Sequence, residues 1–334
     1  MSTGTNPVNK SEPLIRPATA KETAAVTQST TKSAVGWQIC DFQHAMRSSL
    51  EKPPWVIEDL LLEQTATLVS AHPHAMKSLS WLYACLEAVV KKQVWGHFKA
   101  LNVESVLFVE TEDPSWVVEA RIKGFAKGLG IAETADVPGF HYACVGPFDL
   151  PKTERHIVSL IEKLSPNFMV ISTLQSLLAG RDWKEQTDMQ PVMAAIVRLS
   201  RACPIVLLTH SPWDSHQRRA AGTVTQTANF LTTMHYKKVV NQKTKETFLH
   251  VLTDSKVGAL ETSFSLKLLT EGDPRAPAGV RGVEFVGEGW PKGLGKAAVL
   301  AAIEDDPDAS PKEIADRTGM GVRYVQMMRK RGNK

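Results

Sequence analysis

Short apolar runs of strand length alternate with segments of helical periodicity along the middle of this 334-residue chain. Runs rich in β-branched or aromatic residues lie at 65–70, 105–110, 140–145, 167–172 and 204–209. Apolar residues recur every three or four positions, as in amphipathic helices, at 78–92, 115–129, 153–164 and 189–202. This alternation predicts βαβ units, and therefore an α/β fold with a mainly parallel sheet. Residues 229–239 and 246–255, joined by the polar turn NQKTK, predict an antiparallel hairpin at the edge of that sheet.

The two ends of the chain differ in composition from this middle part. Residues 1–35 contain eleven Ser or Thr and no aromatic residue, so they bury too little apolar surface to offset the entropy of ordering. Residues 271–295 are rich in Gly and Pro, which is typical of a linker. We therefore expect a disordered tail at 1–35, a main domain at 36–270, a linker at 271–295 and a small helical domain at 296–334.

The composition argues against several classes of protein. A formal net charge of +4 permits a polyanionic partner without requiring one. No apolar run reaches the roughly 18 residues of a membrane span, and the N-terminus lacks the regions of a signal peptide. We therefore expect a cytoplasmic protein with no membrane partner. Neither a zinc site nor a disulfide framework is expected, because the four cysteines are widely spaced: Cys40, Cys85, Cys144 and Cys203.

The segment SAHPHAMKSLSW (residues 70–81) lies between a predicted strand and a predicted helix, the context of a phosphate-binding loop, GxxxxGK[ST]. Ala71 and Met76 occupy the two glycine positions, and Lys77 and Ser78 complete the motif. Amides at a helix start bind phosphates, the lysine reaches the outer phosphates, and the hydroxyl ligates magnesium. Met76 can point its side chain outward if its φ is negative. The alternative is a surface lysine at a helix start. The candidate nucleotide-binding residues are Ala71, His72, Pro73, His74, Ala75, Met76, Lys77 and Ser78.

Two stretches resemble the RecA-fold ATPases of the RepA-type hexameric helicase group, which occur on plasmids, phages and genomic islands. They are PPWVIEDLLLEQTATLVSAHPHAMKSLSWLYACLEAVV, from residue 53, and VLFVETEDPSWVVEARIKGF, from residue 106. The resemblance extends through most of residues 53–255. It implies a RecA-like P-loop fold for residues 36–270, ATP and Mg²⁺ as cofactors, and self-association into a ring with nucleotide between subunits.

The same resemblance implies roles for individual residues. Glu112, in the motif ETED between Glu110 and Asp113, corresponds to the glutamate that orients the attacking water. His210 corresponds to a sensor of the γ-phosphate. Ser172 stands where the family has a magnesium-holding aspartate, so only a weak metal contact is expected there beside Ser78. The alternatives are solvated acids on a loop for the ETED residues and a structural histidine for His210.

A later stretch, RRAAGTVTQTANFLTTM, resembles another family motif. Gly222 matches that motif, whereas Asn229 occupies the position of a usual aspartate. Arg218 and Arg219 are candidate arginine fingers that would reach a neighbouring subunit's nucleotide. The alternative is a solvated basic loop.

The C-terminal residues predict three helices. Ser310 as N-cap, Pro311 at the first helical position and Glu313 form a capping box. The glycine-containing turn TGMG then leads to a basic final helix, so the unit resembles a helix-turn-helix. The alternative is a protein-docking module. The candidate DNA-binding residues are Arg323, Tyr324, Gln326, Arg329, Lys330 and Arg331.

Three hypotheses of function remain. The first is a DNA-associated RecA-fold ATPase of replication or recombination, similar to the RepA helicases. The second is a DNA-binding adaptor that holds nucleotide, hydrolyses it poorly and uses the RecA fold to oligomerise. The third is a structural subunit that binds no nucleotide. DNA and other replication, recombination or transposition proteins are candidate partners of the chain.

Overall fold

The computed structural model of the chain describes residues 41–47, 53–211, 229–241, 244–256, 263–272, 276–290, 296–318 and 320–332. The chain divides into two units, Met1–Pro53 and Pro54–Lys334. In the first unit the described residues form helix α2 (Phe42–Arg47). The tail predicted at 1–35 lies outside the described residues. Within the described part of the chain, no helix is long and apolar enough to cross a membrane.

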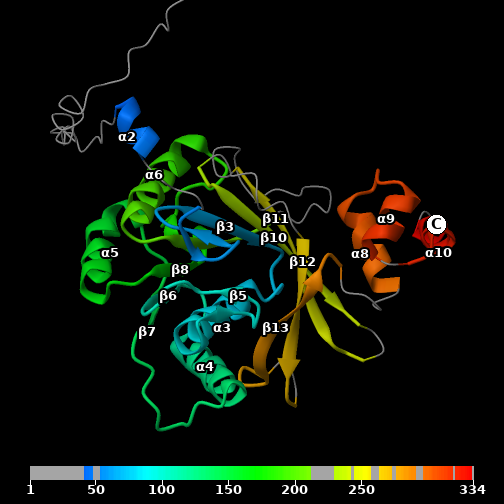
Figure 1. Ribbon diagram of the computed structural model, residues 1–334, viewed down its shortest axis with the longest axis horizontal. Coiled ribbons are helices and arrows are strands. Elements are labelled where there is room, and N and C mark those ends of the chain that lie inside the picture. The colour runs from blue at the N-terminus through cyan, green and yellow to red at the C-terminus, as the bar shows by residue number, and fades with distance from the viewer. Residues whose placement is uncertain are drawn as a thin grey trace, which may run out of the picture. The chain divides into compact units, whose positions relative to one another are not determined.

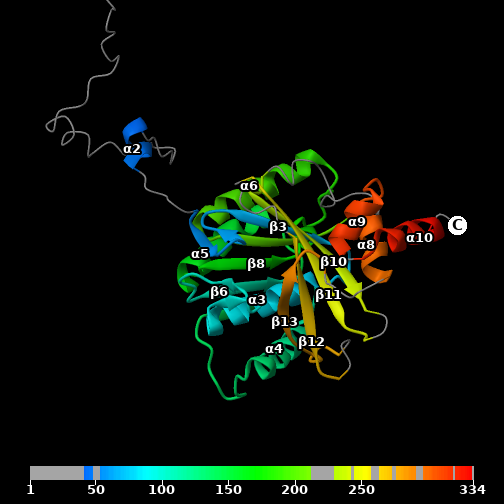
Figure 2. The same cartoon turned by 45° about the vertical axis from the view of Figure 1, so that its right-hand side comes forward.

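The second unit is built on a nine-stranded sheet of order β13-β12-β11-β10-β3-β9-β8-β6-β7 (Figures 1 and 2). Strand pairing is parallel from β10 to β7 and antiparallel from β10 to β13. This architecture confirms the predicted α/β class with a mainly parallel sheet. The strands are β3 (Ala66–Ala71), β6 (Val106–Glu110), β7 (Phe140–Cys144), β8 (Phe168–Ser172), β9 (Ile205–His210), β10 (Thr232–Val240), β11 (Thr247–Ser255), β12 (Ser263–Thr270) and β13 (Val280–Glu288).

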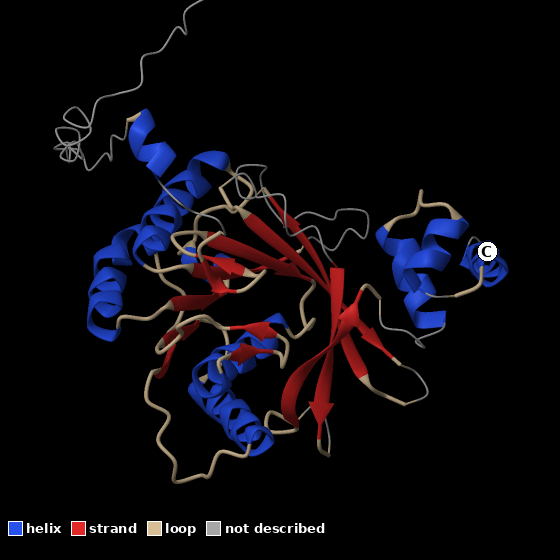
Figure 3. Ribbon diagram, in the orientation of Figure 1, coloured by secondary structure: helices blue, strands red, loops and turns tan. Residues whose placement is uncertain are grey.

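Four helices cover the parallel strands on both faces (Figure 3). Helices α3 (Lys77–Lys91) and α4 (Ser115–Leu129) share one apolar cluster with Val69 and Phe108 of the sheet. Helices α5 (Leu150–Leu164) and α6 (Gln186–Ala202) share a second cluster with Leu68 and Leu107. Neighbouring residues of one strand enter opposite clusters because side chains alternate across a sheet.

The remaining described elements are short. They are β1 (Trp55–Ile57), β2 (Leu61–Leu62), β4 (Gln93–Val94), β5 (Phe98–Lys99) and the 3₁₀ helix η1 (Leu174–Leu177). The two small antiparallel pairs β1–β2 and β4–β5 lie outside the main sheet. Every helix and strand predicted between 65 and 209 is present, and α4 has the predicted bounds.

Two predictions about the sheet edge are wrong. The antiparallel hairpin forms, as β10 and β11, but β10 pairs with β3 and β11 pairs with β12, so the hairpin lies inside the sheet. The residues 271–295 are not simply a linker, because 280–288 form the edge strand β13.

Glycines allow β13 to cross closely over helix α4. A Cβ placed on Gly128 would lie 1.8 Å from the carbonyl oxygen of Arg281, and one on Gly124 would lie 2.6 Å from that of Val280. Side chains at these positions would push the strand away. The two glycines of the helix thus belong to packed structure.

The three predicted C-terminal helices are present as α8 (Lys296–Asp305), α9 (Pro311–Thr318) and α10 (Val322–Gly332). We call residues 296–332 the C-terminal module. The capping box forms, because the Ser310 amide donates to Glu313 at 2.6 Å and the Glu313 amide donates to the Ser310 hydroxyl at 3.2 Å. The module shares an apolar cluster with Val239, Phe248 and Trp290.

The imidazole of His250 on β11 fixes Trp290 beside this cluster. The two rings stack with centroids 3.9 Å apart, and Nδ1 of His250 lies 3.2 Å from the Ser265 hydroxyl. Burial lowers the pKa of His250 to about 3. The folded protein therefore holds this residue neutral where the unfolded chain would protonate it.

This difference predicts that the fold loses stability as pH falls below about 6.5, since the unfolded chain then binds the extra proton. We expect the free energy of unfolding to decrease by up to about 1.4 kcal/mol per pH unit from His250 alone. Urea unfolding between pH 7 and pH 4.5 measures this slope. His250→Phe keeps a ring against Trp290 and should flatten the slope. Equal slopes in the variant and the wild type would refute the assignment.

Candidate functional site

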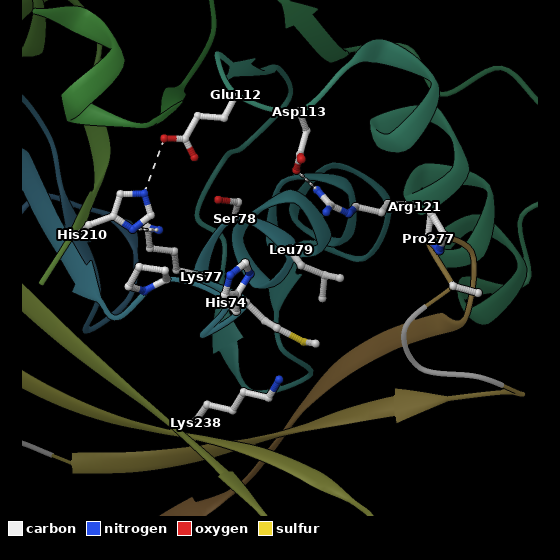
Figure 4. Close-up of a pocket in the computed structure, with 13 residues that line it drawn as sticks. His74, Lys77, Ser78, Leu79, Glu112, Asp113, Arg121, His210, Lys238 and Pro277 are labelled. Carbon is white, nitrogen blue, oxygen red and sulfur yellow. Dashed lines mark hydrogen bonds and ion pairs between the residues drawn. The ribbon is translucent and has the colours of Figure 1, made fainter. Parts of the chain in front are cut away.

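The carboxyl ends of strands β3, β6 and β9 border a cavity of about 500 Å³ (Figure 4). Parallel strands end at the same edge of a sheet, which is where α/β proteins bind their ligands. Helices α3 and α4, strand β10 and the turn before β13 complete the wall. The lining residues are Pro73, His74, Met76, Lys77, Ser78, Leu79, Glu112, Asp113, Arg121, His210, Lys238, Ala276 and Pro277.

The loop after β3 turns through two left-handed residues. His74 has φ 64° and Met76 has φ 60°, a region that non-glycine residues avoid. Met76 therefore does not have the negative φ that was the condition for an outward-pointing side chain. Met76, at the second glycine position of the usual motif, adopts a left-handed backbone conformation that is strained for a residue with a Cβ atom. Helix α3 begins immediately afterwards at Lys77. The Ser80 amide donates a hydrogen bond to the carbonyl oxygen of Met76 at 3.0 Å.

Lys77 points into the molecule. It is 5% exposed, and its ammonium lies 3.2 Å from Nδ1 of His210. The alternative of a surface lysine at a helix start is thus wrong. Burial lowers the pKa of Lys77, while the carboxylates of Glu112, Glu110 and Asp113 act in the opposite direction. The buried ammonium thus contacts an imidazole at the start of a helix whose first amides have no acceptor within the helix.

The carboxylate of Glu112 is held by two groups at the cavity. The Thr173 hydroxyl donates to Oε1 of Glu112 at 2.7 Å, and Nε2 of His210 lies 3.4 Å from the same oxygen. The hydrogen bond from His210 holds the pKa of Glu112 below its usual value, with smaller contributions from Thr173 and from the charge of Lys77. The structure thus brings Lys77, His210 and Glu112 into one chain of contacts, and Glu112 is ionised at neutral pH.

The two neighbouring acids have other partners. Glu110, 2% exposed, accepts backbone amides of Thr111 and Glu112, each at 3.0 Å. It therefore shapes the loop that carries Glu112, and burial raises its own pKa. Asp113 binds Arg121 at 2.6 Å. Glu110 is therefore not a solvated acid, whereas the side chains of Glu112 and Asp113 are 42% and 38% exposed while they keep these partners.

The family resemblance implies a magnesium ion at the loop hydroxyl of Ser78, and the side chain hydrogen-bonded to that hydroxyl is Ser172. The hydroxyls of Ser78 and Ser172 lie 2.8 Å apart, and Ser172 is fully buried. Among the described residues, no group of three His, Cys, Asp or Glu side chains could hold a metal ion. The pair fits a magnesium ion that keeps most of its water ligands, because magnesium dehydrates reluctantly. It does not supply the negative charge of an aspartate.

Several other predicted residues fall elsewhere. Arg218, Arg219 and Gly222 lie outside the described residues, and Asn229 lies three residues before the start of β10. The sequence reasoning missed Arg121, Lys238 and Pro277. Lys238 lies on the correctly predicted hairpin, but the register of β10 against β3 was needed to place it at the cavity.

The predicted DNA-binding residues lie on α10 and differ in their surroundings. Arg323, Gln326 and Lys330 are exposed, whereas Tyr324 packs against the apolar cluster of the module. The Arg329 guanidinium donates to the carbonyl oxygens of Pro307, at 3.0 Å, and of Ala309. Arg329 therefore braces the module. The side chain of Arg331 lies outside the described residues.

Residues 38–216, more than half of the chain, match a family of AAA domains. No curated protein sequence matches the chain. Among solved structures, the chain is similar to a KaiC-like protein from the hyperthermophilic archaeon Pyrococcus horikoshii OT3. The TM-score is 0.46 with 13% identity, over 69% of this chain and 93% of that one.

The left-handed turn predicts a measurable strain at Met76. Met76→Gly and Met76→Ala remove nearly the same packing, but only glycine also removes the Cβ that makes φ 60° costly. We expect the Gly variant to be more stable than the Ala variant by about 1 kcal/mol in urea unfolding. A less stable Gly variant would mean that the turn carries no strain.

Proposed function

The chain belongs to the AAA domain family, and we propose that it is a DNA-associated RecA-fold ATPase that binds ATP in the cavity at the end of β3. In this proposal it acts in replication or recombination, similarly to the RepA helicases. It assembles as a ring with nucleotide between subunits. The ATPase core then comprises residues 54–290, including β12 and β13, and the C-terminal module binds DNA.

One observation carries the nucleotide site: a buried ammonium, Lys77, lies at a helix start, and its hydrogen-bond partner among the described residues is the imidazole of His210 at 3.2 Å. A desolvated cation gains more from an anion than from an imidazole nitrogen. Phosphate oxygens would therefore take the place of His210 as the partner of Lys77. The amides at the start of α3 favour the same negative charge.

Glu112 is the proposed general base for hydrolysis. Its ionised carboxylate can orient a water molecule and accept its proton. The hydrogen bonds from Thr173 and His210 to one oxygen, Oε1, fix the side chain. His210 contacts both Lys77 and Glu112. Loss of the γ-phosphate would therefore alter the position of His210, and through it the position of Glu112. Magnesium, when bound beside Ser78 and Ser172, neutralises charge on the phosphates.

DNA binding is proposed for the exposed basic side of α10. Arg323 and Lys330 are exposed cations on this helix, and Gln326 lies between them in sequence. Cations of this kind bind DNA phosphates, and an amide side chain can contact a base edge. Arg218 and Arg219 remain the proposed arginine fingers of the ring.

A second candidate function is a nucleotide-holding adaptor with little hydrolysis. The specific observation in its favour is the pair of hydroxyls, Ser78 and Ser172, where a carboxylate would anchor magnesium. In that case nucleotide binding would regulate assembly or DNA contact without turnover.

The prediction that separates these functions is ATP hydrolysis measured with and without single-stranded DNA. We expect DNA-stimulated turnover that is lost in Lys77→Met, which removes the phosphate-binding charge and keeps an apolar side chain in the buried position. Glu112→Gln should retain binding of a fluorescent ATP analogue and lose turnover. Binding without turnover in the wild type would select the adaptor. Unchanged turnover in Lys77→Met would reject the site.

A second prediction concerns the DNA contact. The double variant Arg323→Ala/Lys330→Ala should bind DNA more weakly, and the slope of log affinity against log salt should fall by about 2 in magnitude. Fluorescence anisotropy over a salt series measures both quantities. Lys163→Ala, an exposed lysine of α5, is the matched control. A double variant with wild-type affinity and slope would exclude this side of α10.

A further inference from the structure

Strand β10 presents two consecutive lysines to opposite faces of the sheet. Its pairing with β3 ends at Tyr236, opposite Ala71, whereas its pairing with β11 continues to Val240, opposite Thr247. The last residues of β10 therefore run beside the loop that follows β3. Their backbone hydrogen bonds to a neighbouring strand are made with β11 alone. Because side chains alternate along a strand, Lys238 lies on the face of Tyr236, and Lys237 lies on the other.

Lys238 enters the cavity from the wall opposite helix α4 (Figure 4). It lines the same space as His74, Met76 and Lys77. The other cation of the outer wall, Arg121, is already neutralised by Asp113 at 2.6 Å. Within the described ranges, Lys238 has no acidic partner, so its charge is available to an anion that enters the cavity.

Lys237 anchors the C-terminal module on the opposite face. Its ammonium donates to the carbonyl oxygen of Ala301 at 2.6 Å and lies 3.2 Å from the Glu304 carboxylate. The side chain of Lys237 is only 17% exposed. Val239, two residues further on the same face, packs in the apolar cluster that contains Val299. The end of β10 is thus the part of the sheet on which α8 rests.

We propose that Lys238 is a further nucleotide-contacting residue and that β10 transmits its engagement, through Lys237 and Val239, to helix α8. This inference rests on the proposed nucleotide site. A nucleotide that attracts Lys238 toward the loop displaces the end of β10, which is paired with β11 only. Lys237 and Val239, the residues on either side of Lys238, transmit this displacement to the C-terminal module. Nucleotide occupancy thereby controls how firmly the proposed DNA-binding module is docked.

Hydrogen exchange of the full chain, with and without ATPγS, tests this coupling. We expect the nucleotide to slow exchange in the loop at 72–79 and to change exchange across Lys296–Asp305 severalfold. Lys238→Gln keeps a polar side chain, shorter by one bond, and removes its charge. It should bind ATPγS about two- to fivefold more weakly and, at saturation, leave α8 at its nucleotide-free rate. Lys238→Arg should behave as the wild type, and Lys163→Gln is the matched control on α5.

The outcomes distinguish the coupling from the site itself. If ATPγS does not slow exchange at 72–79 in the wild type, the nucleotide site is wrong and the coupling fails with it. If the loop is protected but α8 is unchanged, the site stands and the coupling is overturned. A Lys238→Gln variant that binds and responds as the wild type would likewise overturn it. Faster exchange of α8 in nucleotide-free Lys237→Gln would support the anchor.

Discussion

The turn that joins β3 to α3 sets the position of Lys77 and Ser78 at the cavity, the two groups on which the proposed phosphate site depends. Strand β3 lies between β9 and β10, and its last residue, Ala71, is paired on both sides, with His210 and with Tyr236. The chain must then reverse before α3, and it does so through left-handed residues at His74 and Met76. Helix α3 consequently begins at Lys77, with the ammonium turned inward and the next hydroxyl against Ser172. Backbone strain of this kind persists where the surrounding structure over-determines it, often at functional sites.

The three carboxylates of the ETED motif place negative charge near that turn, and each has its own partners. Glu110 accepts backbone amides, Glu112 contacts Thr173 and His210, and Asp113 neutralises Arg121. Only Glu112 both faces the cavity and has a pKa held below its usual value by these contacts. The position next to the Ser78 hydroxyl lacks a carboxylate, since Ser172 stands there. The chain therefore offers fixed cations for phosphates and weak support for a metal, which is why binding and turnover are separate questions for it.

The sequence predicted the helices and strands of the central sheet between residues 65 and 209. It predicted less of the sheet edge and of the cavity lining. Strong apolar periodicity defined α4 to its exact bounds and each parallel strand to within a residue, because these elements are packed on fixed faces. The Gly and Pro of residues 271–295 suggested a linker, although part of this range forms β13, whose close crossing is allowed by Gly124 and Gly128 of α4. The sign of φ at Met76 depends on tertiary constraint and opposed the intrinsic preference of methionine. Lys238 could not be placed without the register between β10 and β3, which no local pattern encodes.

The central claim is that a loop without glycines still holds a nucleoside triphosphate through Lys77. The most direct measurement is calorimetric titration of the full chain with ATPγS, with magnesium and with a chelator. The account predicts stoichiometric binding in both conditions, with little dependence on magnesium, because Ser172 gives the metal no charge. Ser172→Asp should make the affinity depend strongly on magnesium. No binding by the wild-type chain in either condition would contradict the account.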